Sequence, residues 1–159
     1  MNTVKPIPKG FHAITPYLAV KDAKAAIAFY QHVFGAKEIG RILMPGGTIG
    51  HAELQIGDAK IMLAQEMPEW GNKSPSSLGG TAVGLALYVA DVDAVFQRAL
   101  DAGATVIELV KDQFYGDRSG AVLDPLGHKW HILTHKEEVS FEEMQKRCDA
   151  MCEATTGEA

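Results

Sequence analysis

Apolar and polar residues follow one another in an order that the chain uses twice. The stretch ITPYLAVKDAKAAIAFYQHVFGAKEI (14–39) has a strand-like run, an Asp, a helical run and then Gly-Ala, and VGLALYVADVDAVFQRALDAGATVI (83–107) repeats that order. Apolar residues in both helical runs recur at the spacing of one helix face, at Ala26, Ile27, Tyr30, Val33 and Phe34 and at Val92, Val95, Phe96, Ala99 and Leu100. We expect each helix to begin after an Asp that caps its free N–H groups and to end at a Gly.

Three strand-like pieces follow each expected helix. They cover 37–43, 50–56 and 60–64 in the first half, and 105–110, 119–123 and 129–135 in the second. The pattern is βαβββ, twice, in modules at about 12–66 and 81–136 joined by a Gly-, Pro- and Ser-rich linker at 67–80. It predicts a single α+β domain in which the modules form an open, barrel-like mixed sheet around a cavity that suits a small molecule. A capping-box pattern adds a C-terminal helix over 140–154.

Composition narrows the class of protein. The 159 residues are 47% hydrophobic and 22% charged, which is ordinary for a globular chain with a real core. The net charge is −5 and the basic residues form no run, so nucleic acid is not an expected partner. No apolar stretch reaches the roughly 20 residues that cross a bilayer, so a membrane is not expected either, and the start MNTVKPIPKG does not resemble a secretory signal. We expect a cytoplasmic protein with Cys148 and Cys152 reduced, on a C-terminal helix whose apolar stripe packs on the body or on a partner subunit.

Three of the six histidines lie in DPLGHKWHILTH (124–135). On a helix His128, His131 and His135 would share one face, as in a metal site. The turn residues followed by an apolar run instead predict a turn and a strand. His128 then supports the turn, His135 lies at the end of the strand, and His131 faces the cavity as a ligand, a substrate-binding group or a structural histidine.

A second polar row lies in GHAELQI (50–56). His51, Glu53 and Gln55 share one face of the expected strand, because side chains alternate along a strand. This face is either a cluster that binds substrate, with Glu53 as a base and His51 tuning it, or a solvated polar row facing a wet groove.

Three aromatic residues and an arginine are further candidates. In FYGDRSG (114–120), Tyr115 would close the pocket and Arg118 would bind an anionic oxygen of the substrate, unless the segment is only a turn. Tyr17 and Tyr88 occupy related positions on the first strand of each half. At least one of them should face the cavity, although an aromatic core explains them more simply.

The doubled βαβββ order, AIAFYQHVFGA (26–36) and LDPLGHKW (123–130) resemble the vicinal oxygen chelate superfamily, over about residues 12–136. That superfamily takes in glyoxalase I, bleomycin-resistance proteins, fosfomycin-resistance enzymes and extradiol dioxygenases. GHAELQIGD (50–58), DQFYGDRSG (112–120) and THKEEVS (134–140) are similar to its PhnB-like subgroup. The resemblance implies a homodimer, in which the subunits often exchange halves.

The resemblance also implies a divalent metal held by four equivalent strands. The corresponding positions here are Thr15, Glu53, Gly84 and His131, so only Glu53 and His131 keep metal-capable side chains. A metal (Zn, Ni, Mn or Fe) would rest weakly on those two residues, unless His51 or a neighbouring subunit adds a ligand, with Thr15 left to contact substrate. Glyoxalase I and extradiol chemistry need a firmly held metal, so classical glyoxalase I activity is not expected.

These observations predict a protein that binds a small oxygenated metabolite or drug in a cavity. As a lyase or isomerase, it would use Glu53 or a weakly held metal to take a proton alpha to a carbonyl. The alternative is a metal-free protein that sequesters or senses its ligand without catalysis. The fold does not choose between them.

Overall fold

A computed structural model describes residues 4–156, and these residues form two compact units. The first unit contains the chain up to Val83 together with the turn Asp124–His128. The second contains Gly84–Leu123 and the chain from Lys129 onward. Each unit has its own core, and each is described by itself.

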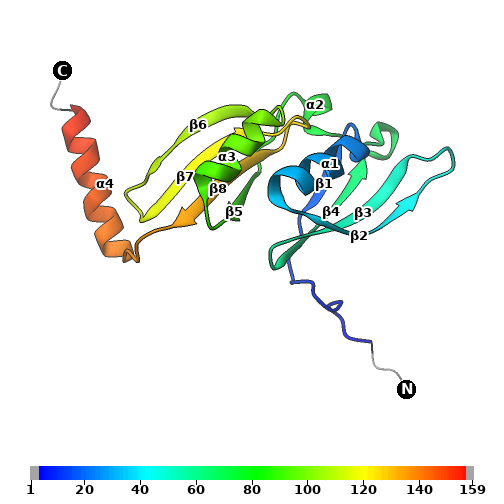
Figure 1. The fold of residues 1–159 in the computed structure, drawn as a ribbon, viewed down its shortest axis with the longest axis horizontal. Coiled ribbons are helices and arrows are strands. Elements are labelled where there is room, and N and C mark those ends of the chain that lie inside the picture. The colour runs from blue at the N-terminus through cyan, green and yellow to red at the C-terminus, as the bar shows by residue number, and fades with distance from the viewer. Residues whose placement is uncertain (1–3, 157–159) are drawn as a thin grey trace. The chain divides into compact units, whose positions relative to one another are not determined.

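The first unit is a βαβββ module. Its elements are β1 (Tyr17–Val20), α1 (Ala23–Phe34), β2 (Lys37–Leu43), β3 (Ile49–Ile56) and β4 (Ala59–Gln65). The sheet order is β1-β4-β3-β2, in which β1 runs parallel to β4 and the other pairs are antiparallel (Figure 1). The expected order of elements and the mixed sheet are confirmed for this half.

Helix α1 covers one face of this sheet because its apolar stripe is buried there. The Asp22 side chain accepts a hydrogen bond from the Ala25 N–H at the start of the helix, and Gly35 ends it in the left-handed conformation with φ 66°. The buried core includes Ala26, Ile27, Tyr30 and Val33 of α1 with Ala52, Leu54 and Leu63 of the sheet. The alternation along β3 therefore leaves its polar row on the other face of the sheet.

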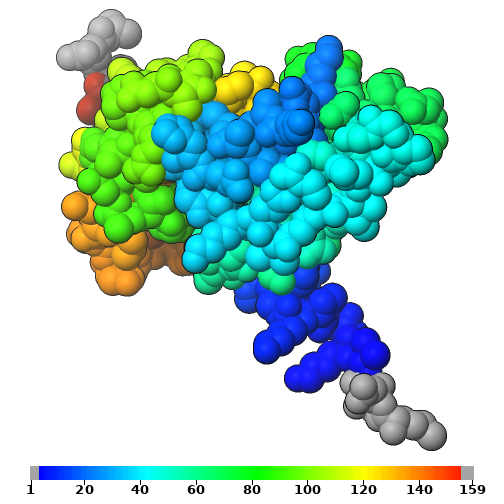
Figure 2. Space-filling model, turned by 45° about the vertical axis from the view of Figure 1, so that its right-hand side comes forward, coloured from blue at the N-terminus to red at the C-terminus, as the bar shows by residue number. Residues whose placement is uncertain are grey.

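The β2–β3 hairpin lies at the surface of the first unit, where Figure 2 shows it in cyan. Three of its large apolar side chains are exposed: Ile39, Ile42 and Leu43. The N-terminal arm contacts the same sheet through Phe11, whose ring lies 4.1 Å from Lys60 Nζ.

The linker predicted at 67–80 contains two short helical turns, η1 (Pro68–Trp70) and α2 (Pro75–Leu78). Ser74 caps α2, and Gly79 ends it in the left-handed conformation. The carboxylate of Glu66 holds this turn by accepting hydrogen bonds from the Ser74 N–H at 2.9 Å and the Ser77 hydroxyl at 3.0 Å. These hydrogen bonds from Ser74 and Ser77 lower the pKa of Glu66 to about 2.

The DPLGH turn belongs to the core of the first unit. The buried Tyr30 hydroxyl donates to Asp124 Oδ2 at 2.7 Å, and the same carboxylate accepts the N–H of His128 at 2.9 Å. His128 Nε2 lies 2.9 Å from the carbonyl oxygen of Ala19 in β1. The prediction that His128 supports this turn is confirmed.

The second unit repeats the module. Its elements are β5 (Gly84–Tyr88), α3 (Val92–Asp101), β6 (Thr105–Asp112), β7 (Asp117–Leu123) and β8 (Lys129–His135), followed by α4 (Phe141–Thr156). The sheet order is β5-β8-β7-β6, with β5 parallel to β8 (Figure 1). Its core contains Val92, Phe96 and Ala99 of α3 with Val122, Trp130 and Ile132 of the sheet.

Both ends of α3 follow the sequence pattern. Asp91 accepts the Ala94 N–H at 3.0 Å and caps the helix as expected. The helix also stops at a Gly as expected, because Gly103 takes the left-handed conformation with φ 98° directly after the C-cap residue Ala102. A hydrogen bond from the Ala104 N–H to the Ala99 carbonyl closes this last turn.

Helix α4 is joined to the second unit through Arg147. Its guanidinium binds Glu137 at 2.8 Å and Glu143 at 3.0 Å, and it donates to the carbonyl of Phe114. Burial raises the pKa of the Cys148 thiol, which is the opposite of what a reactive thiolate needs. Within residues 4–156, no helix is long and apolar enough to cross a membrane.

Candidate functional site

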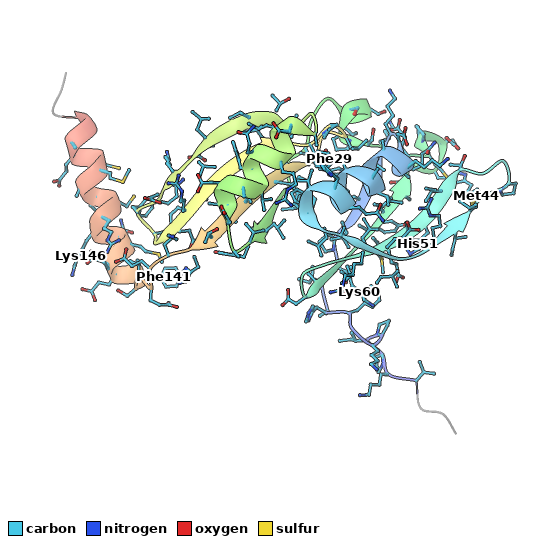
Figure 3. All side chains as sticks on the ribbon, in the orientation of Figure 1. Phe29, Met44, His51, Lys60, Phe141 and Lys146 are labelled. Atoms are coloured by element: carbon cyan, nitrogen blue, oxygen red, sulfur yellow. The ribbon has the colours of Figure 1, made fainter. Side chains whose placement is uncertain are left out.

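The polar row of β3 lies on the open face of the first sheet, opposite α1. Ala52, Leu54 and Ile56 are buried, and the residues between them are partly exposed. Figure 3 shows His51 and Lys60 on the side of the sheet that α1 does not cover. The prediction that His51, Glu53 and Gln55 share a face away from the helix is confirmed.

Tyr17, His51 and Glu53 form a connected cluster on this face. The Tyr17 hydroxyl lies 3.2 Å from His51 Nδ1, and His51 Nε2 lies 3.5 Å from Glu53 Oε1. The rings of Tyr17 and His51 meet edge to face at 5.5 Å between centroids. Tyr17 is 57% exposed, and the His51 and Glu53 side chains are each more than a quarter exposed. The cluster can therefore donate to and accept from a ligand oxygen, and it contains groups able to move a proton.

Two other predicted binding residues of the first unit lie at the margin of this cluster. The Gln55 amide donates to the Gly57 carbonyl at 2.8 Å, which turns it toward the β3–β4 turn. Thr15 lies two residues before β1 and is partly exposed. Their contact with substrate stays a prediction.

The second sheet also has an open face. A side chain at Gly120 of β7 would meet Phe96 of α3 at 2.8 Å, so the even positions of β7 face the helix. Asp117 and Ser119 therefore lie on the other face, where they pair with His135 and Leu133 of β8. Tyr88 of β5 pairs with Leu133 and lies on this same face.

A buried carboxylate organises the open face of the second sheet. Asp117, only 5% exposed, has one oxygen 2.8 Å from His135 Nδ1 and accepts the Tyr88 hydroxyl on the other at 2.9 Å. The hydrogen bond to Asp117 raises the pKa of Tyr88, and hydrogen bonds to Asp117 and Glu138 raise that of His135. Nearby, the Tyr115 hydroxyl lies 3.0 Å from Ser119 Oγ.

This carboxylate cluster was missed from the sequence. The sequence pattern predicts a pocket segment or a turn over 114–120 and places His135 at the end of its strand, with no link between the two. Alternation along each strand could have indicated the cluster. Positions 117 and 119 share one face of β7, positions 131, 133 and 135 share one face of β8, and the pairing of the two strands puts these faces on the same side. His135 lies at the end of its strand as expected, and it is tied to Asp117.

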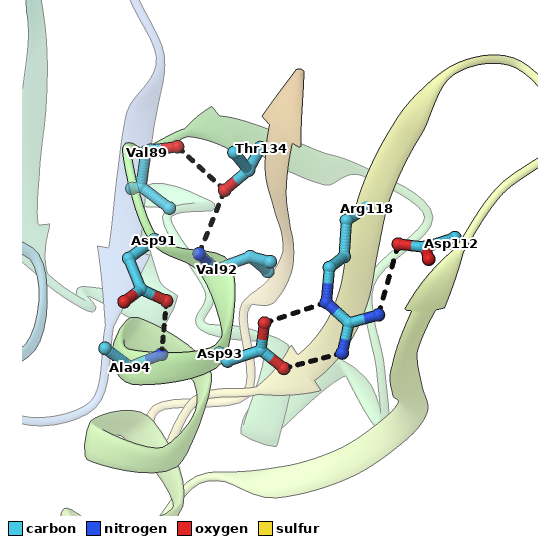
Figure 4. A network of polar contacts seen from close by, with 8 residues as sticks. All are labelled: Val89, Asp91, Val92, Asp93, Ala94, Asp112, Arg118 and Thr134. Atoms are coloured by element: carbon cyan, nitrogen blue, oxygen red, sulfur yellow. Dashed lines mark hydrogen bonds and ion pairs between the residues drawn. The ribbon is translucent and has the colours of Figure 1, made fainter. Parts of the chain in front are cut away.

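Arg118 lies on the opposite face of the second sheet from that cluster. Its guanidinium binds both oxygens of Asp93 at 2.8 Å and Asp112 at 3.1 Å, as Figure 4 shows. Beside it is a hollow of about 300 Å³, which also borders Asp91, Thr134 and Lys136. The structure thus gives Arg118 a role in joining α3 to β6 and β7, and its contact with an anionic substrate stays a prediction.

Gly84 and His131 meet in the second unit. A Cβ at Gly84 would come 2.8 Å from His131 Nε2, so the imidazole lies over the backbone of β5 at this glycine. The superfamily pattern would place a metal ligand at position 84. Here a glycine provides no donor and makes room for the histidine ring.

The donor set does not fit the four-ligand metal site that the resemblance implies. In the first unit the two equivalent positions supply the Glu53 carboxylate and the Thr15 hydroxyl, and in the second only His131 supplies a donor. Over residues 4–156, no group of three or more His, Cys, Asp or Glu side chains is arranged to hold a metal ion. A metal on Glu53 and His131 stays a prediction.

Comparison with known proteins defines the family. Residues 10–132 match the model of the Glyoxalase/Bleomycin resistance protein/Dioxygenase superfamily, and the chain belongs to that family. The protein Mb0911c of Mycobacterium bovis, whose function is uncharacterized, is 48% identical over 136 residues, which cover 84% of this chain and 90% of that protein.

Solved structures agree with this membership. TioX from Micromonospora sp. ML1 is 29% identical, with a TM-score of 0.62 over 78% of this chain and 98% of that one. A PhnB protein from Bacillus cereus, a putative 3-demethylubiquinone-9 3-methyltransferase, has a TM-score of 0.62 over 77% of this chain and 99% of that chain. At 17% identity it shares the fold alone.

Proposed function

We propose that the protein binds a small oxygenated metabolite or drug at the open face of its first sheet, without a metal. The single observation that supports this is the connected cluster of Tyr17, His51 and Glu53. It places a phenol, an imidazole and a carboxylate beside one another on an uncovered sheet face. Polar groups of this kind, held on rigid strands, fix the orientation of a small ligand.

The three side chains have complementary roles in this proposal. Tyr17 is the most exposed and donates a hydrogen bond to a ligand oxygen. His51 contacts both of the other residues, so it holds the cluster together. Glu53 accepts from a ligand hydroxyl, and it is the group that would take a proton if the ligand is also turned over.

A second function, sequestration without turnover, is favoured by the residues at two of the superfamily ligand positions. Thr15 and Gly84 supply no strong metal donor. Bleomycin resistance, which the family name includes, is an activity that binding alone would explain. The two functions share the same binding site and differ only in whether a proton leaves the ligand.

Isothermal titration calorimetry tests the proposal with two probes that the family name suggests, bleomycin and S-lactoylglutathione. We expect saturable binding of at least one probe that is unchanged by EDTA. His51→Ala and Tyr17→Phe should each weaken it by about tenfold, because each removes one or two hydrogen bonds to the ligand. His32→Ala, an exposed histidine of α1, is the matched control. Absence of saturable binding to both probes, or binding abolished by EDTA, would contradict the proposal.

A further inference from the structure

We propose that His135, positioned by Asp117, is a general base on the open face of the second sheet that takes a proton from an uncharged carbon acid. This goes beyond the function proposed above, because it concerns another unit and other residues. Either proposal can therefore fail while the other stands.

The anchor of the proposed base is the buried carboxylate of Asp117. Its two oxygens are both engaged, one by His135 Nδ1 at 2.8 Å and the other by the Tyr88 hydroxyl at 2.9 Å. Because a carboxylate only accepts hydrogen bonds, it selects the tautomer of His135 that carries hydrogen on Nδ1. The lone pair of the neutral imidazole is then on Nε2, which points away from Asp117.

The Nε2 atom of His135 is accessible to a ligand. The His135 side chain is 49% exposed, and its Nε2 lies 3.2 Å from the Glu138 carboxylate. The Glu138 side chain is 97% exposed, and ion pairs so exposed contribute little. A ligand can therefore replace Glu138 without disturbing the Asp117 anchor.

The surroundings of His135 suit proton abstraction from carbon. The raised pKa of His135 makes its neutral form a stronger base than a free histidine, at pH values where that form is populated. The Tyr115 hydroxyl is hydrogen-bonded to Ser119 on the same face, and it can donate to an oxygen on which negative charge develops.

The charges beside His135 select the substrate class. Asp117 and Glu138 are the carboxylates that act on it, and both disfavour an anionic ligand. Leu133 lies between Tyr88 and Ser119 in the sheet, and the Tyr88 ring is 61% exposed. These groups favour an uncharged, flat molecule with an acidic C–H bond.

The test uses 5-nitrobenzisoxazole, a neutral aromatic carbon acid that needs no cofactor. His135 Nε2 takes the ring C–H proton, the C–H electron pair forms the nitrile, the N–O bond breaks, and its electron pair stays on the phenolate oxygen. The coloured cyanonitrophenolate is followed by its absorbance. We expect the wild-type rate to rise with pH through the pKa of His135, because only the neutral imidazole accepts the proton.

Substitutions separate the base from its positioning residue. His135→Gln should lower the rate by about tenfold or more, and the exposed side chain makes a folding defect unexpected. Asp117→Asn should move the pH profile to lower pH, because the imidazolium loses its charged partner, and should lower the plateau rate. His12→Asn, an exposed histidine near the N-terminus, should change neither.

Two results would overturn the proposal. One is a wild-type rate that His135→Gln leaves unchanged. The other is an Asp117→Asn variant whose rate falls while its pH profile stays in place, since that is the behaviour of a residue that only supports the fold. Circular dichroism of each variant shows that the rates are compared between folded proteins.

Discussion

The open faces of the two sheets carry the same three kinds of side chain and connect them in a different order. In the first unit the histidine is central, with Tyr17 on one side of His51 and Glu53 on the other. In the second unit the carboxylate is central, with Tyr88 and His135 on either side of Asp117. In both, a tyrosine of the first strand reaches the third strand of the module, although Tyr17 is the first residue of β1 and Tyr88 is the last residue of β5.

The carboxylates of the two clusters also differ in burial. Glu53 is partly exposed and its contact with His51 is 3.5 Å long, whereas Asp117 is buried and its contacts are 2.8 and 2.9 Å. A buried carboxylate must keep its hydrogen bonds, because leaving it unsatisfied costs free energy. The first cluster is therefore free to exchange its contacts for those of a ligand, and the second is fixed around its acid.

The largest expected effect follows directly from this contrast. Asp117→Ala should lower the free energy of unfolding of the second unit by about 2 kcal/mol, because two hydrogen bonds to a buried carboxylate are lost. Glu53→Ala should change stability by about 0.5 kcal/mol or less, since exposed ion pairs contribute little. Urea unfolding followed by the fluorescence of the buried Trp130 measures the first loss. Similar losses in the two variants would show that the two carboxylates contribute equally to stability, which contradicts the contrast.

The pH dependence of the second cluster gives the next effect. The pKa of His135 is raised in the folded protein, so its contacts stabilise the fold fully below the ordinary pKa of about 6.5. That stabilisation is lost as the pH rises through the raised value. The stability difference between wild type and His135→Asn should therefore shrink from pH 5 to pH 9. A constant difference would mean that the ion pair contributes nothing measurable.

In the first unit, Glu66 gives stability the opposite dependence on pH. Its pKa is lowered from 4.5 to about 2, so the hydrogen bonds from Ser74 and Ser77 stabilise the fold above 4.5. The stabilisation is lost as the pH falls toward 2. Acid unfolding of Glu66→Gln should show a smaller loss of stability over this range than the wild type. Glu69→Gln, in the neighbouring turn η1, is the control that should keep the wild-type profile.

The smallest expected effect concerns metal. Because Thr15 and Gly84 supply no strong donor, elemental analysis of protein purified without added metal should find far less than one Ni, Zn, Mn or Fe per chain. The content should be the same in Glu53→Ala. Near-stoichiometric metal that disappears in Glu53→Ala would show that the first cluster is a metal site. Glu53 would then be a metal ligand and not the group that accepts from the ligand hydroxyl.

The order of elements was predictable from the sequence because local chemistry determines it. Both N-caps and the bounds of β2 and β8 agree with the pattern, since Asp22, Asp91 and the alternating runs act over a few residues. The end of α3 also follows from a local signal, because Gly103 takes the left-handed conformation that stops the helix.

The candidate sites were predictable only in part. The row at His51 and Glu53 followed from alternation within one strand, but the contact of His51 with Tyr17 spans 34 residues. The Asp117 cluster joins three strands, so it required the pairing of β5, β8 and β7 to be known. Arg118 shows the same limit, because its aspartate partners lie on a helix and a neighbouring strand.

The DPLGH turn has a consequence for how the protein is made. Tyr30 and Asp124 are 94 residues apart, and the buried Leu126 fills the same core. During translation, β5, α3, β6 and β7 are therefore synthesised before the last core residues of the first unit. A fragment that ends at Val83 would lack the carboxylate that accepts the Tyr30 hydroxyl, so the first half of this repeat is not expected to be a self-sufficient folding unit.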